Sequence, residues 1–81
     1  MHIAIRFFAA HRDVLGTPTL ALDVAEGTTA EAAFAMLCEQ YPPLRSAASS
    51  VAFAVNQRQT SGSHVLSEGD ELALLPPMAG G

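Results

Sequence analysis

The sequence has 81 residues, 49% of them hydrophobic and 15% charged, which predicts one small globular domain and excludes a disordered chain. Its net charge of −4 argues against a nucleic-acid-binding protein, and no apolar run approaches the roughly 20 residues needed to cross a bilayer. The single cysteine, Cys38, excludes an internal disulfide and, with no signal-peptide pattern at the N-terminus, favours a cytoplasmic protein.

Alternating hydrophobicity predicts two strands in the first part of the chain. In residues 2–8, the side chains of Ile3, Ile5 and Phe7 fall on one face of a half-buried strand. Residues 9–16 are long enough for one or two helical turns, with Gly16 at the position of a C-cap. Residues 19–24 alternate again and predict a second strand.

The strongest helix signal covers residues 28–41. Thr28 and Glu31 have the spacing of a capping box, and Pro42-Pro43 should end the helix. The predicted apolar face consists of Ala30, Ala33, Phe34, Leu37, Cys38 and Tyr41. Cys38 lies in the second half of the helix, where the helix dipole does not favour a thiolate, so we expect a small core residue.

The second half of the chain predicts further strands and turns. Residues 44–50 read as a loop or a short helical turn, and residues 51–56 as a third strand. Residues 57–63 form a predicted polar turn, and residues 64–66 a short edge piece. A tight turn at residues 67–70 leads into a last strand at residues 71–75, with Leu72 and Leu74 inward. This order predicts an α+β fold, in which a mixed sheet of four or five strands packs on one main helix.

The same alternation leaves two large apolar side chains, Phe8 and Leu75, on the sheet face away from the helix. Exposed apolar patches usually mark a binding surface. Two alternatives remain: the alternation is offset by one residue, or the loop at residues 42–50 covers these side chains.

The body of the predicted domain contains no self-sufficient active site. His2, His11 and His64 lack the spacing of metal ligands, and one cysteine cannot build a zinc site. Asp70 and Glu71 are neighbours on a strand, so their side chains point apart and cannot act as an acid–base pair. We therefore expect no metal and no catalysis by the isolated chain.

The last six residues, 76–81, predict an extended tail beyond the domain of residues 1–75. Pro76 and Pro77 cannot continue a strand ladder, and six residues reach at most about 20 Å. Gly80 and Gly81 have no side chains, so this tail could enter a narrow tunnel on another protein. A terminal carboxylate is a poor electrophile, but after activation as an acyl-adenylate it could accept sulfide or an amine.

Several segments together resemble the MoaD family, the small sulfur-carrier subunits of molybdopterin synthase. These are the opening strand with residues 7–16, the helix at residues 28–42, residues 54–57 and, most specifically, residues 66–81. The resemblance implies a ubiquitin-like β-grasp fold. It also implies that an E1-like, MoeB-like adenylyltransferase uses ATP to activate Gly81, and that sulfur transfer then gives a thiocarboxylate.

The family resemblance further implies a partner and a docking surface. The tail with Gly80 and Gly81 would insert into the large, MoaE-like subunit, within a heterotetramer, and give its sulfur to cyclic pyranopterin monophosphate. The candidate docking residues are Phe8, Arg12, Leu75, Pro76, Pro77 and Met78. Arg12 could equally be a solvated helix residue.

Two other functions stay open at this point. One is a carrier for another pathway, as in the thiazole-forming ThiS proteins, cysteine synthesis or tRNA thiolation. The second is an interaction module whose terminal Gly-Gly is incidental. The absence of lysine would protect a reactive acyl group from attack by its own chain, but a bias toward alanine and arginine is the simpler explanation.

Overall fold

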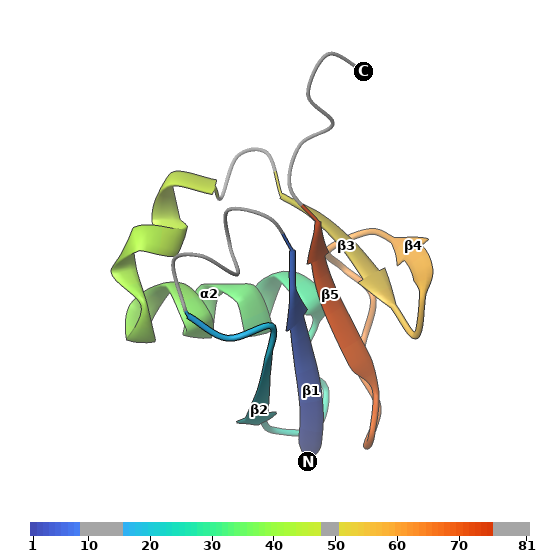
Figure 1. Ribbon diagram of the computed structural model, residues 1–81. Helices are drawn as coiled ribbons and strands as arrows, with labels where there is room; N and C mark the ends of the chain where they lie inside the picture. The colour runs from blue at the N-terminus through green and yellow to red at the C-terminus, as the bar shows by residue number, and fades with distance from the viewer. Residues whose placement is uncertain (9–15, 48–50, 76–81) are drawn as a thin grey trace.

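The computed structural model describes residues 1–8, 16–47 and 51–75, which form a mixed sheet with a helix across one face (Figure 1). The strands are β1 (His2–Phe7), β2 (Thr19–Asp23), β3 (Ala52–Val55), β4 (Arg58–Thr60) and β5 (Glu71–Leu75). The described helices are α2 (Ala30–Gln40) and the 3₁₀-helix η1 (Pro42–Ala47). The predicted helix at residues 9–16 lies outside the described residues, apart from Gly16, which has a φ of +71°.

The sheet has the strand order β2-β1-β5-β3-β4. The pairing of β1 with β5 is parallel, and the other three pairings are antiparallel, so the predicted mixed sheet is confirmed. A parallel pairing requires a crossover between the two strands, and α2 belongs to that crossover. As a result β5, the last strand, occupies the centre of the sheet.

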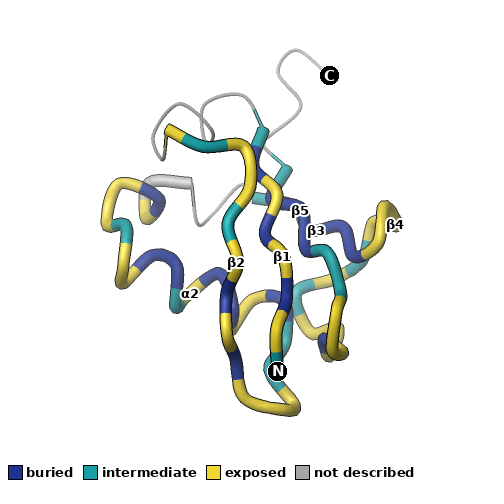
Figure 2. Tube along the Cα trace, turned by 60° about the horizontal axis from the view of Figure 1, so that its bottom comes forward, coloured by how far each residue is buried: buried dark blue, intermediate teal, exposed yellow. Residues whose placement is uncertain are grey.

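The core lies between the sheet and α2. Burial alternates along β1 as predicted, with Ile3, Ile5 and Phe7 buried and the residues between them exposed (Figure 2). Leu72 and Leu74 of β5 are buried in the same core, opposite the apolar face of α2. The buried residues of α2 are Ala30, Ala33, Phe34, Leu37 and Cys38. Tyr41, predicted on this face, is the C-cap and is only partly buried.

The N-terminus of α2 differs from the predicted capping box by one residue. Thr29, not Thr28, is the N-cap, and its side chain accepts a hydrogen bond of 3.2 Å from the backbone N–H of Ala32. Thr28 instead donates its hydroxyl to the carbonyl of Ala25 at 2.6 Å. Only Thr28 has a glutamate three positions on, whereas the residue three positions after Thr29 is Ala32, so the predicted capping box is wrong. The hydroxyl of Thr28 is used in the turn before the helix, and Thr29 caps the helix.

The loop before β5 supplies further partners to this helix end. The backbone N–H of Ala30 donates to the carbonyl of His64 at 3.0 Å, and that of Glu31 to Gly62 at 2.9 Å. A Cβ at Gly62 would lie 2.9 Å from the Cβ of Glu31, so only glycine allows this approach without a shift. The predicted edge piece at residues 64–66 forms one isolated bridge, between Val65 and Thr29.

The predicted polar turn at residues 57–63 is wrong in part, because β4 occupies Arg58–Thr60. β4 pairs antiparallel with β3 through a two-residue turn at Asn56 and Gln57, whose φ angles are 52° and 70°. Two central residues with positive φ are typical of the type I′ turns that connect tight hairpins.

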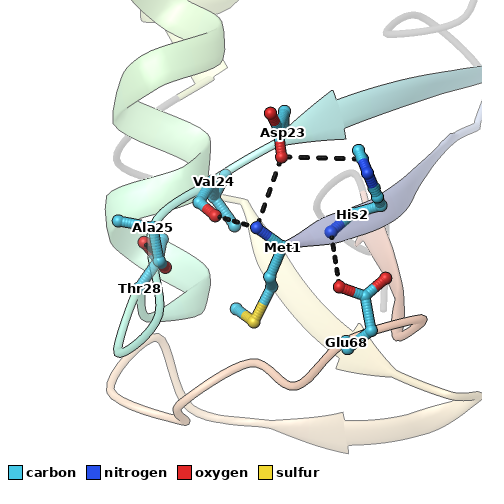
Figure 3. A network of polar contacts seen from close by, with 7 residues as sticks. All are labelled: Met1, His2, Asp23, Val24, Ala25, Thr28 and Glu68. Carbon is cyan, nitrogen blue, oxygen red and sulfur yellow. Dashed lines mark hydrogen bonds and ion pairs between the residues drawn. The ribbon is translucent and has the colours of Figure 1, made fainter.

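The N-terminal end of the sheet is held by polar contacts (Figure 3). The ammonium of Met1 donates to the carbonyl of Val24 at 2.7 Å and to Oδ1 of Asp23 at 3.3 Å. The backbone N–H of His2 donates to Oε1 of Glu68 at 3.0 Å. These contacts join the start of β1 to the end of β2 and to the turn before β5.

Candidate functional site

The central strand leads directly to the predicted reactive tail. Leu74 is in register with Phe7 of β1, and Leu75 is in register with Ala52 of β3. β5 therefore ends at Leu75 between the neighbouring strands β1 and β3, at the end of the sheet opposite Met1 (Figure 1). Because ladders on both sides fix β5, the starting point of the tail is fixed as well.

Phe8 and Leu75, the predicted docking residues within the described part of the chain, lie next to this exit. Each is half-buried, and neither belongs to the core cluster. The guanidinium of Arg6 lies over the Phe8 ring, with Cζ 5.1 Å from the ring centroid, which is within the range of a cation–π interaction. Phe8 therefore lies on the same face of β1 as Arg6, away from the core.

The sheet face opposite α2 contains a group of small side chains among larger polar ones. It carries Ala4, Ala21, Ala52, Ala54 and Ala73 at alternating strand positions. Ala54 and Ala73 are buried at the centre of the sheet, yet they lie outside the core cluster. A face built of alanines is shallow, so a partner could approach the backbone closely between the flanking larger residues.

Arg6 is a neighbour of the candidate docking residue Phe8 that the sequence pattern did not identify. Besides contacting Phe8, its Nη1 atom lies 3.9 Å from Oε1 of Glu71 on β5. This contact depends on the parallel register of β1 and β5, which brings together residues that are 65 positions apart in a chain of 81. A basic residue on an alternating strand gives no such signal by itself.

Asp70 and Glu71, which the sequence excludes as an acid–base pair, have separate structural contacts. Asp70 accepts hydrogen bonds from the side-chain amide of Asn56 at 2.9 Å and from the backbone N–H of Ser67 at 2.7 Å. The backbone N–H of Glu71 donates to Oδ1 of Asn56 at 3.0 Å. These contacts tie the β3–β4 turn to the start of β5 and position the central strand.

The described residues contain no cluster of three or more His, Cys, Asp or Glu side chains able to hold a metal ion. Cys38 is buried in the core, as predicted, and burial raises the pKa of its thiol, against a smaller lowering effect of Arg45. Neither α2 nor any other helix in residues 1–8, 16–47 and 51–75 has the length and apolarity to cross a membrane.

The remaining predicted site residues lie outside the described residues. They are Arg12, Pro76, Pro77, Met78, Gly80 and Gly81. The structure therefore describes two of the candidate docking residues, Phe8 and Leu75, and their docking role stays a prediction.

A family model described as the ThiS family matches residues 5–81 of this sequence. The chain belongs to the ThiS family. It is also 33% identical, over its whole length and 84% of the relative, to the molybdopterin synthase sulfur carrier subunit of Arabidopsis thaliana. The resemblance to the sulfur carriers that the sequence indicated is thereby confirmed.

Solved structures agree with this assignment. SAMP1 of Haloferax volcanii superposes with a TM-score of 0.87 at 27% identity, covering 100% of both chains. The ubiquitin of Caldiarchaeum subterraneum, at 20% identity, shares the fold with a TM-score of 0.66 over 100% of this chain and 98% of its own. The ThiS-family chain described here therefore has the ubiquitin-like β-grasp fold predicted from the sequence.

Proposed function

We propose that this chain is the sulfur carrier subunit of a molybdopterin synthase. The observation that carries the proposal is the match, over the entire chain, to a relative named for that role. The geometry supports it, since β5 lies at the centre of the sheet and ends at Leu75, directly before the predicted reactive tail. In this function the folded domain is recognised by the partner proteins, and the C-terminal carboxylate of Gly81 is the reactive group.

The chemistry requires an activating enzyme, because a carboxylate does not react with sulfide unaided. An E1-like adenylyltransferase would use ATP to convert the Gly81 carboxylate into an acyl-adenylate. A sulfur donor would then displace AMP and leave a thiocarboxylate. No cofactor stays bound to the carrier itself, and the unpaired Cys38 suits the reducing cytoplasm in which such an exchange would proceed.

The large synthase subunit is the proposed acceptor, in a heterotetramer with two copies of each subunit. Its surface would contact Phe8, Leu75 and the alanine-lined face of the sheet, while Pro76, Pro77 and Met78 lead the tail inward. Arg12 is a further candidate contact. Gly80 and Gly81 would then reach the pterin precursor, cyclic pyranopterin monophosphate, which receives the sulfur.

Intact mass spectrometry of the chain isolated from its own cells tests the carrier function. We expect a fraction of the full-length chain to be heavier by the difference between sulfur and oxygen, with the change mapped to Gly81. A chain lacking Gly81 should show no such species and should not support molybdopterin formation. The control is Gly62→Ala, which perturbs the domain but leaves the tail intact. Absence of the heavier species after incubation with ATP, a sulfur source and the E1-like enzyme would refute the carrier role.

Carriers for thiazole synthesis, cysteine synthesis or tRNA thiolation would pass the same mass test. Supplying the purified thiocarboxylate form to the large synthase subunit with the pterin precursor separates them. Formation of molybdopterin in that mixture supports the proposed pathway. A plain interaction module, in contrast, would keep its function when Gly81 is deleted.

A further inference from the structure

The chain contains no lysine, since its four basic residues are Arg6, Arg12, Arg45 and Arg58. This matters for a protein whose own C-terminus is to be activated. An acyl-adenylate forms stable amides with primary amines and thioesters with thiols. In this sequence only the α-amino group of Met1 and the thiol of Cys38 belong to those two classes.

The α-amino group of Met1 is engaged in the fold. It donates hydrogen bonds to the carbonyl of Val24 and to the carboxylate of Asp23, and the Met1 side chain is only 8% exposed (Figure 3). The carbonyl of Met1 in turn accepts from the backbone N–H of Val24 at 2.8 Å. An amine must direct its lone pair at the acyl carbon to react, and these contacts hold the Met1 nitrogen against Val24 and Asp23 instead.

The thiol of Cys38 is kept from reacting with the acyl group by burial. It faces the core from α2, the residue is 8% exposed, and burial raises the pKa of the thiol. The reactive form of cysteine is the thiolate, so a buried thiol with a raised pKa does not compete for an acyl group.

The other nucleophiles of the chain are hydroxyl and imidazole groups, which compete poorly for a lasting bond to the acyl group in water. Hydroxyl groups such as those of Ser61 and Ser63 must compete with solvent water of similar reactivity. The imidazoles of His2 and His64 are exposed, but an acyl-imidazole is hydrolysed and returns the free carboxylate.

We propose that the fold and the sequence together leave this chain without an acceptor for its own activated C-terminus, so that a second copy cannot become acylated. The activated acyl group then reacts only with an external sulfur or amine nucleophile. In that step the bond between the acyl carbon and the AMP oxygen breaks, AMP leaves with the electron pair, and the new C–S or C–N bond forms as the nucleophile gives a proton to solvent. The inference rests on the proposed function, because only an activated carboxylate needs such protection.

The test incubates the full-length chain with the E1-like adenylyltransferase and ATP, without a sulfur donor. Pyrophosphate release reports activation, and intact mass spectrometry reports covalent dimers, whose mass is that of two chains less one water. The variants are Arg58→Lys, which adds an exposed amine, and Arg58→Gln, which removes the charge without adding one. A chain with a Gly-Ser extension before Met1 provides an amine outside the contacts with Val24 and Asp23.

We expect pyrophosphate release from every form, but dimers only from Arg58→Lys and from the extended chain. A dimer of the native chain linked at Met1 or Cys38 would overturn the inference. So would failure of Arg58→Lys to dimerise, since missing amines would then not explain the inertness. If only the extended chain failed to dimerise, the engagement of Met1 would not be what protects the native chain. Absence of pyrophosphate release would refute the proposed function instead, which keeps the two failures distinct.

Discussion

Gln57 occupies a backbone conformation that suits glycine. Its φ of +70° lies in the left-handed region, where a Cβ is crowded by its own backbone, and the side chain is exposed. We expect Gln57→Gly to stabilise the protein by about 0.5–1 kcal/mol, because relief of this strain exceeds the added entropy of the unfolded chain. A raised urea midpoint with unchanged m-value would show it. As the control, Gln59→Gly inside β4 should lower the midpoint, and a lower midpoint for Gln57→Gly would contradict the strain argument.

Cys38 should make the stability of the protein depend on pH in the alkaline range. Burial raises the pKa of this thiol above the ordinary value of 9.0, so the unfolded chain loses the proton first as pH rises. The stability contributed by the neutral thiol is therefore complete below pH 9.0 and is lost as pH rises toward and through the folded-state pKa. Urea unfolding between pH 8 and pH 10 should show a steeper decline for the native chain than for Cys38→Ala. Parallel declines would show that Cys38 does not cause it.

At the scale of the element, the N-terminus of α2 separates two adjacent threonines. Thr29 accepts from the N–H of Ala32, whereas Thr28 only donates to the carbonyl of Ala25. Thr29→Ala should lower the free energy of unfolding by about 1 kcal/mol, since it leaves a helix N–H without its protein partner. Thr28→Ala removes an exposed hydrogen bond and should cost less. Chemical denaturation of both variants measures the difference, and a larger loss for Thr28→Ala would place the N-cap one residue earlier.

The elements that the sequence predicts well are those with one buried face. Burial alternates along β1, and in β5 the large side chains Leu72 and Leu74 face the core while the buried residue between them, Ala73, is small. The apolar stripe of α2 ends before Pro42-Pro43. β4 has no buried face: Arg58 and Gln59 are exposed, so its polar sequence reads as a turn. An edge strand of this kind is specified by its hairpin turn and its partner strand. The positive φ angles of Asn56 and Gln57 mark that turn.

The candidate site shows the same division. Phe8 and Leu75 were predicted from the alternation of their strands, which is local information. The position of Arg6 over Phe8 and beside Glu71 follows from the β1–β5 register, which depends on contacts between the two ends of the chain. Cross-strand neighbours of this type cannot be read from a single sequence without the topology.

At the scale of the whole molecule, the two ends of the sheet differ in their contacts. Near Met1, hydrogen bonds from the N–H groups of Met1 and His2 to Asp23, Val24 and Glu68 close the end of the sheet. At the other end, the central strand finishes at Leu75 beside the half-buried ring of Phe8. One end of the sheet is thus stabilised by hydrogen bonds, and the other end precedes the tail. Substitutions near the tail should therefore alter partner binding more than the stability of the fold.

Phe8 tests that separation. If the face around the tail docks on the large subunit, Phe8→Ala should weaken the complex by about 2 kcal/mol, as removal of a central aromatic contact does. Met36→Ala is the matched control, because Met36 is also partly buried but lies on α2, on the opposite side of the sheet. Calorimetric titration of each full-length variant into the purified large subunit gives the affinity, and thermal unfolding gives the stability. Weaker binding for Met36→Ala together with native affinity for Phe8→Ala would move the docking surface to the helix side of the molecule.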